Sequence, residues 1–391
     1  MTINAPNNSS VEDVALIRGG KEYFDLLISL INASKKLVHL QTYIFDDDET
    51  GQKVGEALKA AAQRKVIVRV YVDGYASQVM SQAFINDLRN AGVQFRFFEP
   101  LLKSRYFYFG RRMHHKIFVA DEWHALVGGI NITDRYNDMP GQPAWLDFAL
   151  YTRGGISREL SDFCGRAWSG LSSRMSYWPD KLNEGKRNLA QQQPSQEILV
   201  RRNDWVKGKK EITLTYQKMF RQAESEIMIM CSYFLPGKSI RKLLSMAARK
   251  GVKIKVITAG ISDVKMAKRA ERWLYDWLLR NNIELYEYQS TILHAKIAVC
   301  DRSWFTIGSY NVNNISAYAS LELNLEVRYS DMARMTAEML DRIISSDCTR
   351  ITMEGHRRTR NVLTQFSWWF SYQFIRVVFN MLTFYYKQRR E

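Results

Sequence analysis

The chain has 391 residues, of which 46% are hydrophobic and 25% charged, with a formal net charge of +16. The composition is that of a globular protein, and the length exceeds the usual size of one core, which favours two similar domains. The four cysteines (Cys164, Cys231, Cys300 and Cys348) are far apart and lack CxxC or zinc-type spacing. They exclude a structural zinc site and predict four small core residues in a reducing compartment.

Residues 1–18 are interpreted as a polar N-terminal segment. Residues 1–10 lack the basic stretch and apolar run of a secretory signal, so export is not expected. The N-terminal region also lacks an apolar run of the length that a membrane-spanning helix needs. We therefore expect a protein body without N-terminal spanning helices.

From Gly20 onward, helical and strand-like patterns alternate along the chain. Helices are expected at 23–33, 54–63 and 84–91, and strands at 37–44, 66–72 and 93–98. Segments of the second half repeat this order, such as the strand-like runs at 226–230 and 283–288. Helices between buried strands predict an α/β fold in which helices flank a mixed sheet.

The region 177–196 is poor in apolar residues and contains Pro and Gly, which marks a linker or an exposed loop. We place a domain boundary near residue 190. The expected organisation is a first domain at 19–190, a homologous second domain at 191–350, and a basic, aromatic, amphipathic tail at 351–391. Two homologous halves suggest a pseudo-twofold axis that brings them to one shared active site.

One motif occurs twice, with every shared position shifted by the same number of residues. The motif is HxKxxxxD, followed after six residues by Gly-Gly-x-Asn or Gly-Ser-x-Asn. Its members are His114, Lys116, Asp121 and Asn131 in the first copy and His294, Lys296, Asp301 and Asn311 in the second. Two copies in step predict a duplicated site.

The spacing within each copy indicates phosphodiester chemistry. Because residues i and i+2 share a face of a strand, the His and Lys of each copy point the same way. The lysine can neutralise non-bridging oxygens while the imidazole attacks phosphorus or transfers a proton. Asn131 and Asn311 can donate hydrogen bonds to the same oxygens.

The carboxylates of the motif have a different expected role. The spacing of seven residues is odd and places Asp121 and Asp301 at the far strand end, which favours a structural role near a turn. Asp147 and Glu326, which follow the two histidines by 33 and 32 residues, lie in later strand-like runs. They are the candidates for orienting the histidines, as the acid of a triad does.

The duplicated motif resembles that of the phospholipase D superfamily, and the wider pattern is similar to the bacterial cardiolipin synthases of the soluble-bodied type. The fragments that support this resemblance are residues 41–45, 71–75, 111–114 and 323–326. The resemblance extends to about Cys348. Leu146 and Asn313 depart from the family pattern, and these departures concern the identity of the acceptor.

The resemblance implies a phosphatidyltransferase that acts through a phosphohistidine intermediate. The implied catalytic set is His114, Lys116, Asp121, His294, Lys296 and Asp301. His114 is the implied nucleophile and His294 the acid and base, and phosphatidylglycerol is the implied donor and acceptor. No metal or other cofactor is expected, because two lysines and two asparagines can stabilise the phosphate charge.

Other functions use the same residues. Water as acceptor would make the enzyme a phospholipase, and a nucleic-acid phosphodiester would make it a nuclease. A non-enzymatic basic module that binds membranes or nucleic acid is a further alternative, although both copies of the motif are complete. Nucleic acid is not favoured as a partner, and no obligate protein partner is expected.

Two aromatic segments indicate membrane contact. Residues 361–387 have a broad apolar face with Arg376 near the middle, which favours an interfacial helix over a spanning one. A helix docked on the protein body or on a second subunit is the alternative. Residues 350–391 carry eight Lys or Arg and two Glu, which suits peripheral attachment to the cytoplasmic side of the cell membrane. The basic and aromatic loop at 103–112 suits a membrane rim, nucleic-acid stacking or packing beneath a loop.

Overall fold

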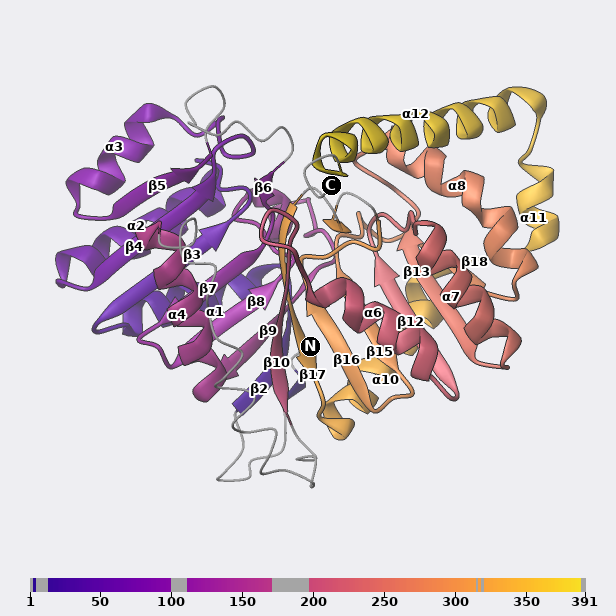
Figure 1. Ribbon diagram of the computed structural model, residues 1–391. Helices are drawn as coiled ribbons and strands as arrows, with labels where there is room; N and C mark the ends of the chain where they lie inside the picture. Colours follow the sequence, from indigo (N-terminus) through magenta and orange to yellow (C-terminus); the bar gives the residue numbers. More distant parts are fainter. Residues whose placement is uncertain are drawn as a thin grey trace.

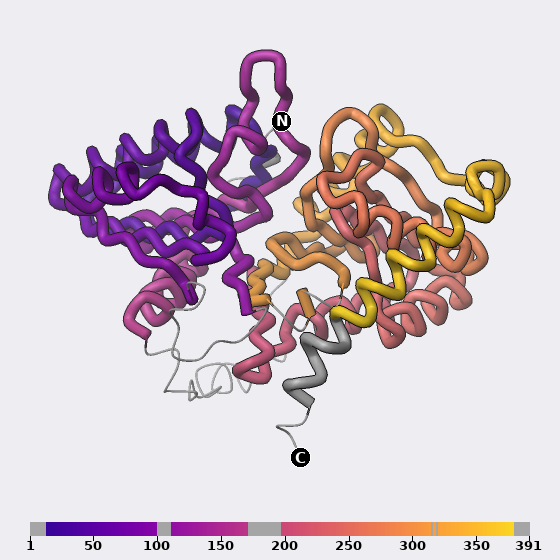
Figure 2. Tube along the Cα trace, turned by 90° about the horizontal axis from the view of Figure 1, so that it is seen from above, coloured from indigo at the N-terminus to yellow at the C-terminus, as the bar shows by residue number. Residues whose placement is uncertain are grey.

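The computed structural model describes residues 3–4, 13–99, 111–170, 197–313, 316–317 and 320–387. In this part of the chain, two mixed sheets lie side by side, each flanked by helices (Figures 1 and 2). The predicted α/β class with two similar sheet domains is confirmed.

The first half contains one sheet in the order β1-β2-β9-β8-β7-β3-β4-β5. Its elements are β1 (Ile3–Asn4), β2 (Asp13–Arg18), α1 (Lys21–Ala33), β3 (Leu37–Thr42), α2 (Glu49–Gln63), β4 (Ile67–Asp73), α3 (Gln82–Asn90), β5 (Gln94–Phe98), β6 (Arg112–Met113), β7 (Lys116–Ala120), β8 (His124–Gly128), β9 (Phe148–Arg153) and α4 (Gly155–Ser169). Strand β6 lies off this sheet and pairs with β17 of the second half.

The second half repeats the arrangement in the order β11-β10-β17-β16-β15-β12-β13-β14-β18. Its elements are β10 (Ile198–Asp204), β11 (Lys209–Lys210), α6 (Glu211–Gln222), β12 (Glu226–Cys231), α7 (Lys238–Arg249), β13 (Lys253–Ala259), α8 (Lys265–Arg280), β14 (Glu284–Tyr288), β15 (Lys296–Cys300), β16 (Trp304–Gly308), β17 (Ser320–Val327), α10 (Ser330–Asp347), β18 (Cys348–Ile351), α11 (Met353–Arg358) and α12 (Val362–Lys387). From β10 to β14, the sheet matches the first half from β2 to β5 strand for strand.

Strands β7 and β15 lie in the interior of their sheets, and their side chains are buried on both faces. All five residues of each strand are buried. In β7, Ile117 and Val119 enter the core that both halves share, while Phe118 and Ala120 enter the core beneath α1, α2 and α3. This continuous apolar run is what a strand buried on both faces requires. The motif residues are thereby attached to a rigid part of each sheet.

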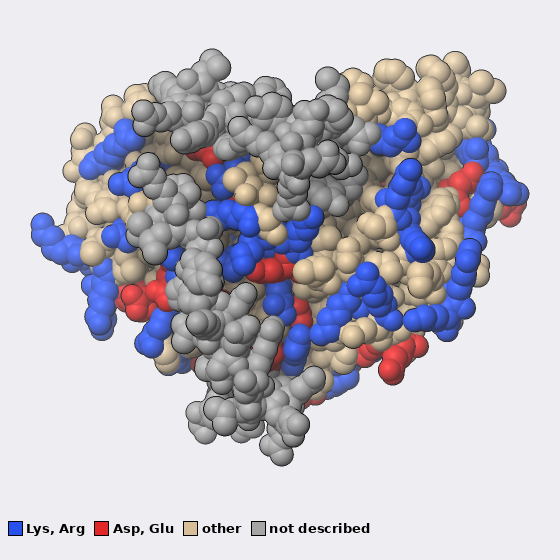
Figure 3. Space-filling model, in the orientation of Figure 1, with Lys and Arg blue, Asp and Glu red and all other residues tan. Residues whose placement is uncertain are grey.

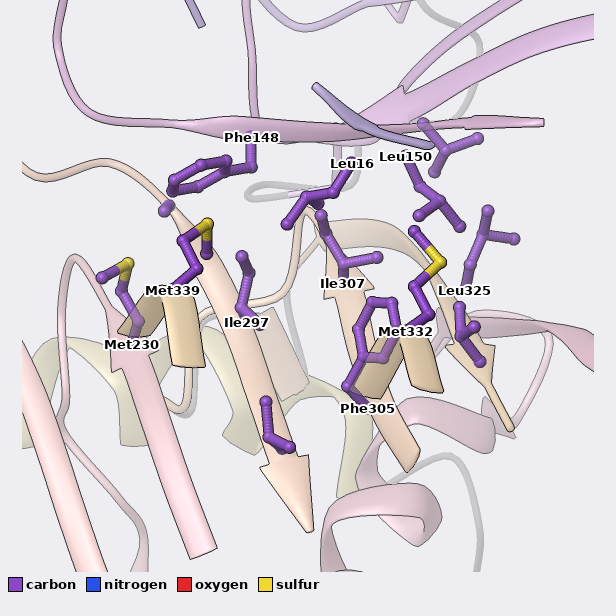
Figure 4. Close-up of a cluster of buried hydrophobic side chains, with 14 of the residues drawn as sticks. Leu16, Phe148, Leu150, Met230, Ile297, Phe305, Ile307, Leu325, Met332 and Met339 are labelled. Carbon is purple, nitrogen blue, oxygen red and sulfur yellow. The ribbon is translucent and has the colours of Figure 1, made fainter. Parts of the chain in front are cut away.

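One hydrophobic core joins the two halves. Leu16, Phe148 and Leu150 from the first sheet lie opposite Ile297 and Ile307 from the second (Figure 4). Helix α10 adds further apolar side chains to this core. Because the inner faces of both sheets are buried against each other, the relative position of the halves is fixed by close packing.

The structure changes the expected domain limits. Residues 13–18, expected within a polar segment, form β2, which pairs with β9 and buries residues 14–17. The first domain therefore begins before residue 18. The second sheet extends to Ile351, because β18 pairs with β14. The expected boundary near residue 190 and the loop residues 103–110 lie outside the described part of the chain.

Candidate active site

The two motif histidines are each anchored to the opposite half of the molecule. His114, two residues before β7, donates its backbone N–H to the carbonyl of Leu321 over 3.0 Å. His294, two residues before β15, donates its backbone N–H to the carbonyl of Leu146 over 2.8 Å. The exchange is reciprocal, as a pseudo-twofold axis between the halves requires.

The carboxylates that orient the histidines are exchanged in the same way. His114 Nδ1 lies 3.0 Å from Glu322 Oε2, and His294 Nδ1 lies 2.6 Å from Asp147 Oδ2. Each acid directly follows the leucine whose carbonyl holds the histidine backbone. Both carboxylates are almost fully buried, which suits an acid that fixes a tautomer. Each His–carboxylate pair is thus assembled from both halves.

Glu326 does not have the expected role. Its carboxylate accepts hydrogen bonds from Arg201 over 2.8 Å, Arg328 over 2.7 Å and Thr215 over 2.9 Å. Four residues along a strand span about 13 Å, so Glu326 lies well beyond reach of the histidine that Glu322 contacts. The prediction for Glu326 is wrong, and Glu322 takes its place.

The spacing criterion failed because the two halves differ in length after the motif. Asp147 follows its motif histidine by 33 residues, whereas Glu322 follows His294 by only 28. A local alignment would have found Glu322, because 146–153 and 321–328 both begin with Leu and an acid and end with Arg. Asp147 does contact a histidine, but the one that belongs to the other half.

The motif lysines are buried beside the histidines. Lys116 Nζ donates to the His114 carbonyl over 2.5 Å and lies 5.1 Å from the centre of the Tyr43 ring. Lys296 Nζ donates to Ser232 Oγ over 3.1 Å and to the His294 carbonyl. Burial lowers the pKa of both lysines, to about 7 for Lys116. A phosphodiester anion in the site would favour their charged forms.

The pKa of each motif histidine is lowered by burial and by the lysines of both copies of the motif. Burial lowers the pKa of His114, and it lowers the pKa of His294 to about 4. Lys296 of the second copy further lowers the pKa of His114, and Lys116 of the first copy does so for His294. These reciprocal effects place the two copies in a single electrostatic environment. With Nδ1 facing a carboxylate, each Nε2 is the nitrogen left for chemistry.

Aromatic rings that were not among the predicted site residues hold the imidazoles in place. Tyr43 lies edge-on to His114, with ring centres 4.9 Å apart. Tyr136 and Trp145 contact His294, with ring centres 5.1 and 6.2 Å away. Such contacts restrict ring rotation and leave the histidines in defined orientations.

Asn131 and Asn311 are both buried. Asn131 donates to the Tyr136 hydroxyl over 2.9 Å and accepts from the backbone N–H of Ile44 over 3.1 Å. Asn311 places its amide oxygen 3.5 Å from Cys231 Sγ. Asn131 thus supports the tyrosine that contacts His294. Direct binding of phosphate by the asparagines stays a prediction.

Asp121 and Asp301 lie at the far ends of β7 and β15 and bind backbone. Asp121 accepts from three consecutive N–H groups, those of residues 35–37, over 2.7 to 2.9 Å. Asp301 does the same with residues 224–226 over 2.8 to 3.0 Å. Although burial opposes the effect, these bonds lower the pKa of both carboxylates. Because of the odd spacing, both carboxylates lie away from the histidines. Asp121 and Asp301 therefore have a structural role and do not belong to the catalytic set that the resemblance implied.

No cluster of three or more His, Cys, Asp or Glu side chains suited to a metal ion occurs among the described residues. The four cysteines are free thiols, three of them buried.

Comparisons with known proteins show the family and the fold of the chain. Residues 27–140 and 216–344 match the family described as "Cardiolipin synthase, PLD-like domain". Cardiolipin synthase B of Shigella flexneri is 31% identical over 360 residues, which cover 91% of this chain and 84% of that protein. Cardiolipin synthase of Halalkalibacterium halodurans is 30% identical over 312 residues, covering 79% and 61% of the two chains. Among solved structures, phosphatidylserine synthase of Haemophilus influenzae has a TM-score of 0.72 at 14% identity over 94% of both chains, which shows a shared fold.

Proposed function

The chain belongs to the cardiolipin synthases of the phospholipase D superfamily, and from this premise we propose that it joins two phosphatidylglycerol molecules into cardiolipin and releases glycerol. The observation that carries the proposal is that each His–Lys set is completed by a carboxylate from the other half, and that the lysine of each set lowers the pKa of the histidine of the other. Such a site can hold one phosphorus atom between a nucleophile and a proton donor.

In the first half-reaction, we assign the attack on phosphorus to Nε2 of His114. The bond from phosphorus to the glycerol oxygen breaks as the phosphorus–nitrogen bond forms, which leaves a phosphatidyl-histidine. Glycerol leaves with a proton from Nε2 of His294. The phosphodiester anion raises the proton affinity of that imidazole, whose pKa is about 4 without substrate. Asp147 stabilises the protonated ring.

In the second half-reaction, the glycerol hydroxyl of another phosphatidylglycerol attacks the phosphorus. His294 accepts its proton, the phosphorus–nitrogen bond breaks, and cardiolipin leaves. Lys116 and Lys296 stabilise the negative charge on the non-bridging oxygens during both steps. Glu322 holds His114 in the tautomer that attacks.

The substrate proposal is tested by incubating the purified protein with phosphatidylglycerol alone, followed by lipid mass spectrometry. Cardiolipin and glycerol in equal amounts are the expected products. Phosphatidic acid as the sole product would replace the transferase with a hydrolase. If no phosphatidylglycerol were consumed while a nucleic-acid substrate was cleaved, the lipid activity would be refuted.

The assignment of the nucleophile has its own test, because the two halves are pseudo-symmetric. A phosphatidyl ester of p-nitrophenol has a leaving group that needs no proton. His294→Ala is therefore expected to release a burst of nitrophenol and retain labelled phosphatidyl on the protein, whereas His114→Ala should do neither. The reverse pattern would exchange the two roles.

The apolar stripe of α12 supports a further part of the proposal, peripheral attachment to the cytoplasmic side of the membrane. Among the described residues, no helix has the length and apolar character needed to cross a membrane. Helix α12 packs along α8 (Figure 1) and buries Trp368 and Ser371 there. Its opposite side exposes Phe366, Phe370 and Phe374, one helical turn apart. One face docks on the protein and the other suits the membrane interface.

A further inference from the structure

A basic hollow lies between α7 and α8, outside the active site described above. Its volume is about 420 Å³, within the range of small-molecule sites. Its lining consists of Lys238, Arg241, Lys242, Ser245, Met246, Arg249 and Trp277. Four of these side chains are cationic and none is acidic. Lys and Arg gather on this face of the second half (Figure 3).

The described residues do not neutralise the cations of the hollow. Within the described part of the chain, none of its four basic side chains forms an ion pair, although ion pairs are frequent elsewhere in the fold. Nε of Arg241 is buried and has no hydrogen-bond partner among the described residues. A buried donor without an acceptor is costly, and an anion that accepts from it would remove this cost.

An adjoining hollow shows the contrast. It measures about 270 Å³ and shares Arg241 and Trp277 with the first. There Asp276 pairs with Arg360 and, over 3.6 Å, with Arg280. Asp276 thus partly balances the positive charge of the adjoining hollow. No described acidic side chain pairs with the cations of the first hollow, which suits it to binding an external anion.

The position of the basic hollow identifies the kind of anion. Gln365 and Trp368 of α12 line the adjoining hollow, so the basic surface continues to the helix that exposes the aromatic stripe. Inside the hollow, Trp277 lies 5.8 Å from the guanidinium of Arg241, and Met246 is 44% exposed. Apolar side chains beside cations suit a phosphate that carries a glycerol and acyl chains.

We propose that the hollow lined by Lys238, Arg241, Lys242 and Arg249 binds the phosphate of an anionic phospholipid headgroup, as a second lipid site apart from the catalytic histidines. This site goes beyond the proposed reaction and rests on the proposed membrane contact of α12. It orients the protein on anionic regions of a bilayer while α12 inserts its aromatic side chains.

The test is binding to vesicles of phosphatidylglycerol in phosphatidylcholine, measured by sedimentation in a His114→Ala background so that lipid is not consumed. Arg241→Gln with Lys242→Gln is expected to lower the vesicle partition coefficient at least tenfold. The matched control is Lys35→Gln with Arg158→Gln, which removes the same charge from exposed positions of the first half. It should change partitioning less than threefold.

Arg241→Lys distinguishes a specific phosphate site from general electrostatic attraction to the membrane. The substitution keeps the charge and loses the buried Nε donor. Threefold or greater loss of partitioning is expected, with an unchanged melting temperature. Unchanged binding of Arg241→Lys, or equal losses in the glutamine pair and its control, would overturn the proposal. Competition by inorganic phosphate or single-stranded DNA as strong as that by phosphatidylglycerol would assign the hollow to those anions. None of these results depends on whether the wild-type protein makes cardiolipin.

Discussion

Replacing Glu322 with Gln tests the histidine–carboxylate exchange between the halves directly. The substitution keeps the size of a fully buried side chain and removes its charge. Glu322 contacts His114 and also accepts from the hydroxyls of Ser309 and Ser320. Although burial opposes the effect, the hydrogen bond from His114 and the charge of Lys116 hold the pKa of Glu322 below its usual range, so the carboxylate is ionised.

The expected fall in kcat follows from the two roles of the Glu322 charge. A hydrogen bond to a charged group contributes roughly 1.5–3 kcal/mol, and its loss alone lowers the rate by about 10- to 150-fold. Gln can also hold the imidazole in the wrong tautomer, and the corresponding change in a Ser-His-Asp triad costs about 10⁴ in kcat. We expect kcat to fall by about 10² to 10⁴.

The same strand supplies a matched control in Glu326→Gln. Glu326 is a buried carboxylate four residues further along β17, held by Arg201 and Arg328 instead of a histidine. Its replacement is expected to lower the melting temperature and to change kcat less than threefold. The assay is cardiolipin formation from phosphatidylglycerol in detergent micelles, with thermal melting as the test of folding. Full activity in Glu322→Gln, or equal loss in the folded Glu326→Gln, would refute the reasoning.

Four further outcomes are expected. Gly129→Ser should lower kcat at least tenfold, because a Cβ there would lie 2.5 Å from the Asp147 carboxylate and displace it from His294; normal kinetics would show that the acid has room to move. Burial lowers the pKa of several histidines to about 3 or 4, so below pH 6.5 the unfolded chain binds protons that the folded chain does not. The free energy of unfolding should therefore fall between pH 6.5 and about 4, by up to about 1.4 kcal/mol per pH unit for each histidine, and denaturant titrations that are flat across this range would contradict it. Truncation after Gly355 should abolish sedimentation with anionic vesicles and leave turnover in micelles, and unchanged sedimentation would exclude α12 as the attachment. EDTA should leave cardiolipin formation unchanged, since lysines stabilise the phosphate, and a loss restored by added metal would require a different mechanism.

The sequence predicted the fold class and the motif residues because both are encoded locally. The apolar run after His114 has the length and composition of a buried strand, and its repetition after His294 required two equivalent sheets. The pairing of each histidine with a carboxylate of the other half is not encoded in a local sequence pattern. Counting residues from each histidine led to Glu326, since the counts ignore a difference in loop length and assume that each acid serves its own half.

Other differences also arise from tertiary packing. Residues 14–17 form a short apolar run whose periodicity alone does not distinguish a buried strand from a helix, and pairing with β9 makes it β2. For α12, the sequence left an interfacial helix and a docked helix as alternatives. The structure combines docking on α8 with an exposed aromatic stripe, because the broad apolar face of the helix exceeds what α8 covers.

The reciprocal anchoring of His114 and His294 makes the two halves depend on each other. A single half has neither pair complete, so by itself it could assemble the site only as a homodimer that exchanged these contacts. In one polypeptide, each copy can change without changing its twin. The two copies do differ, with Asp147 beside a glycine in one and the longer Glu322 beside Ser309 in the other.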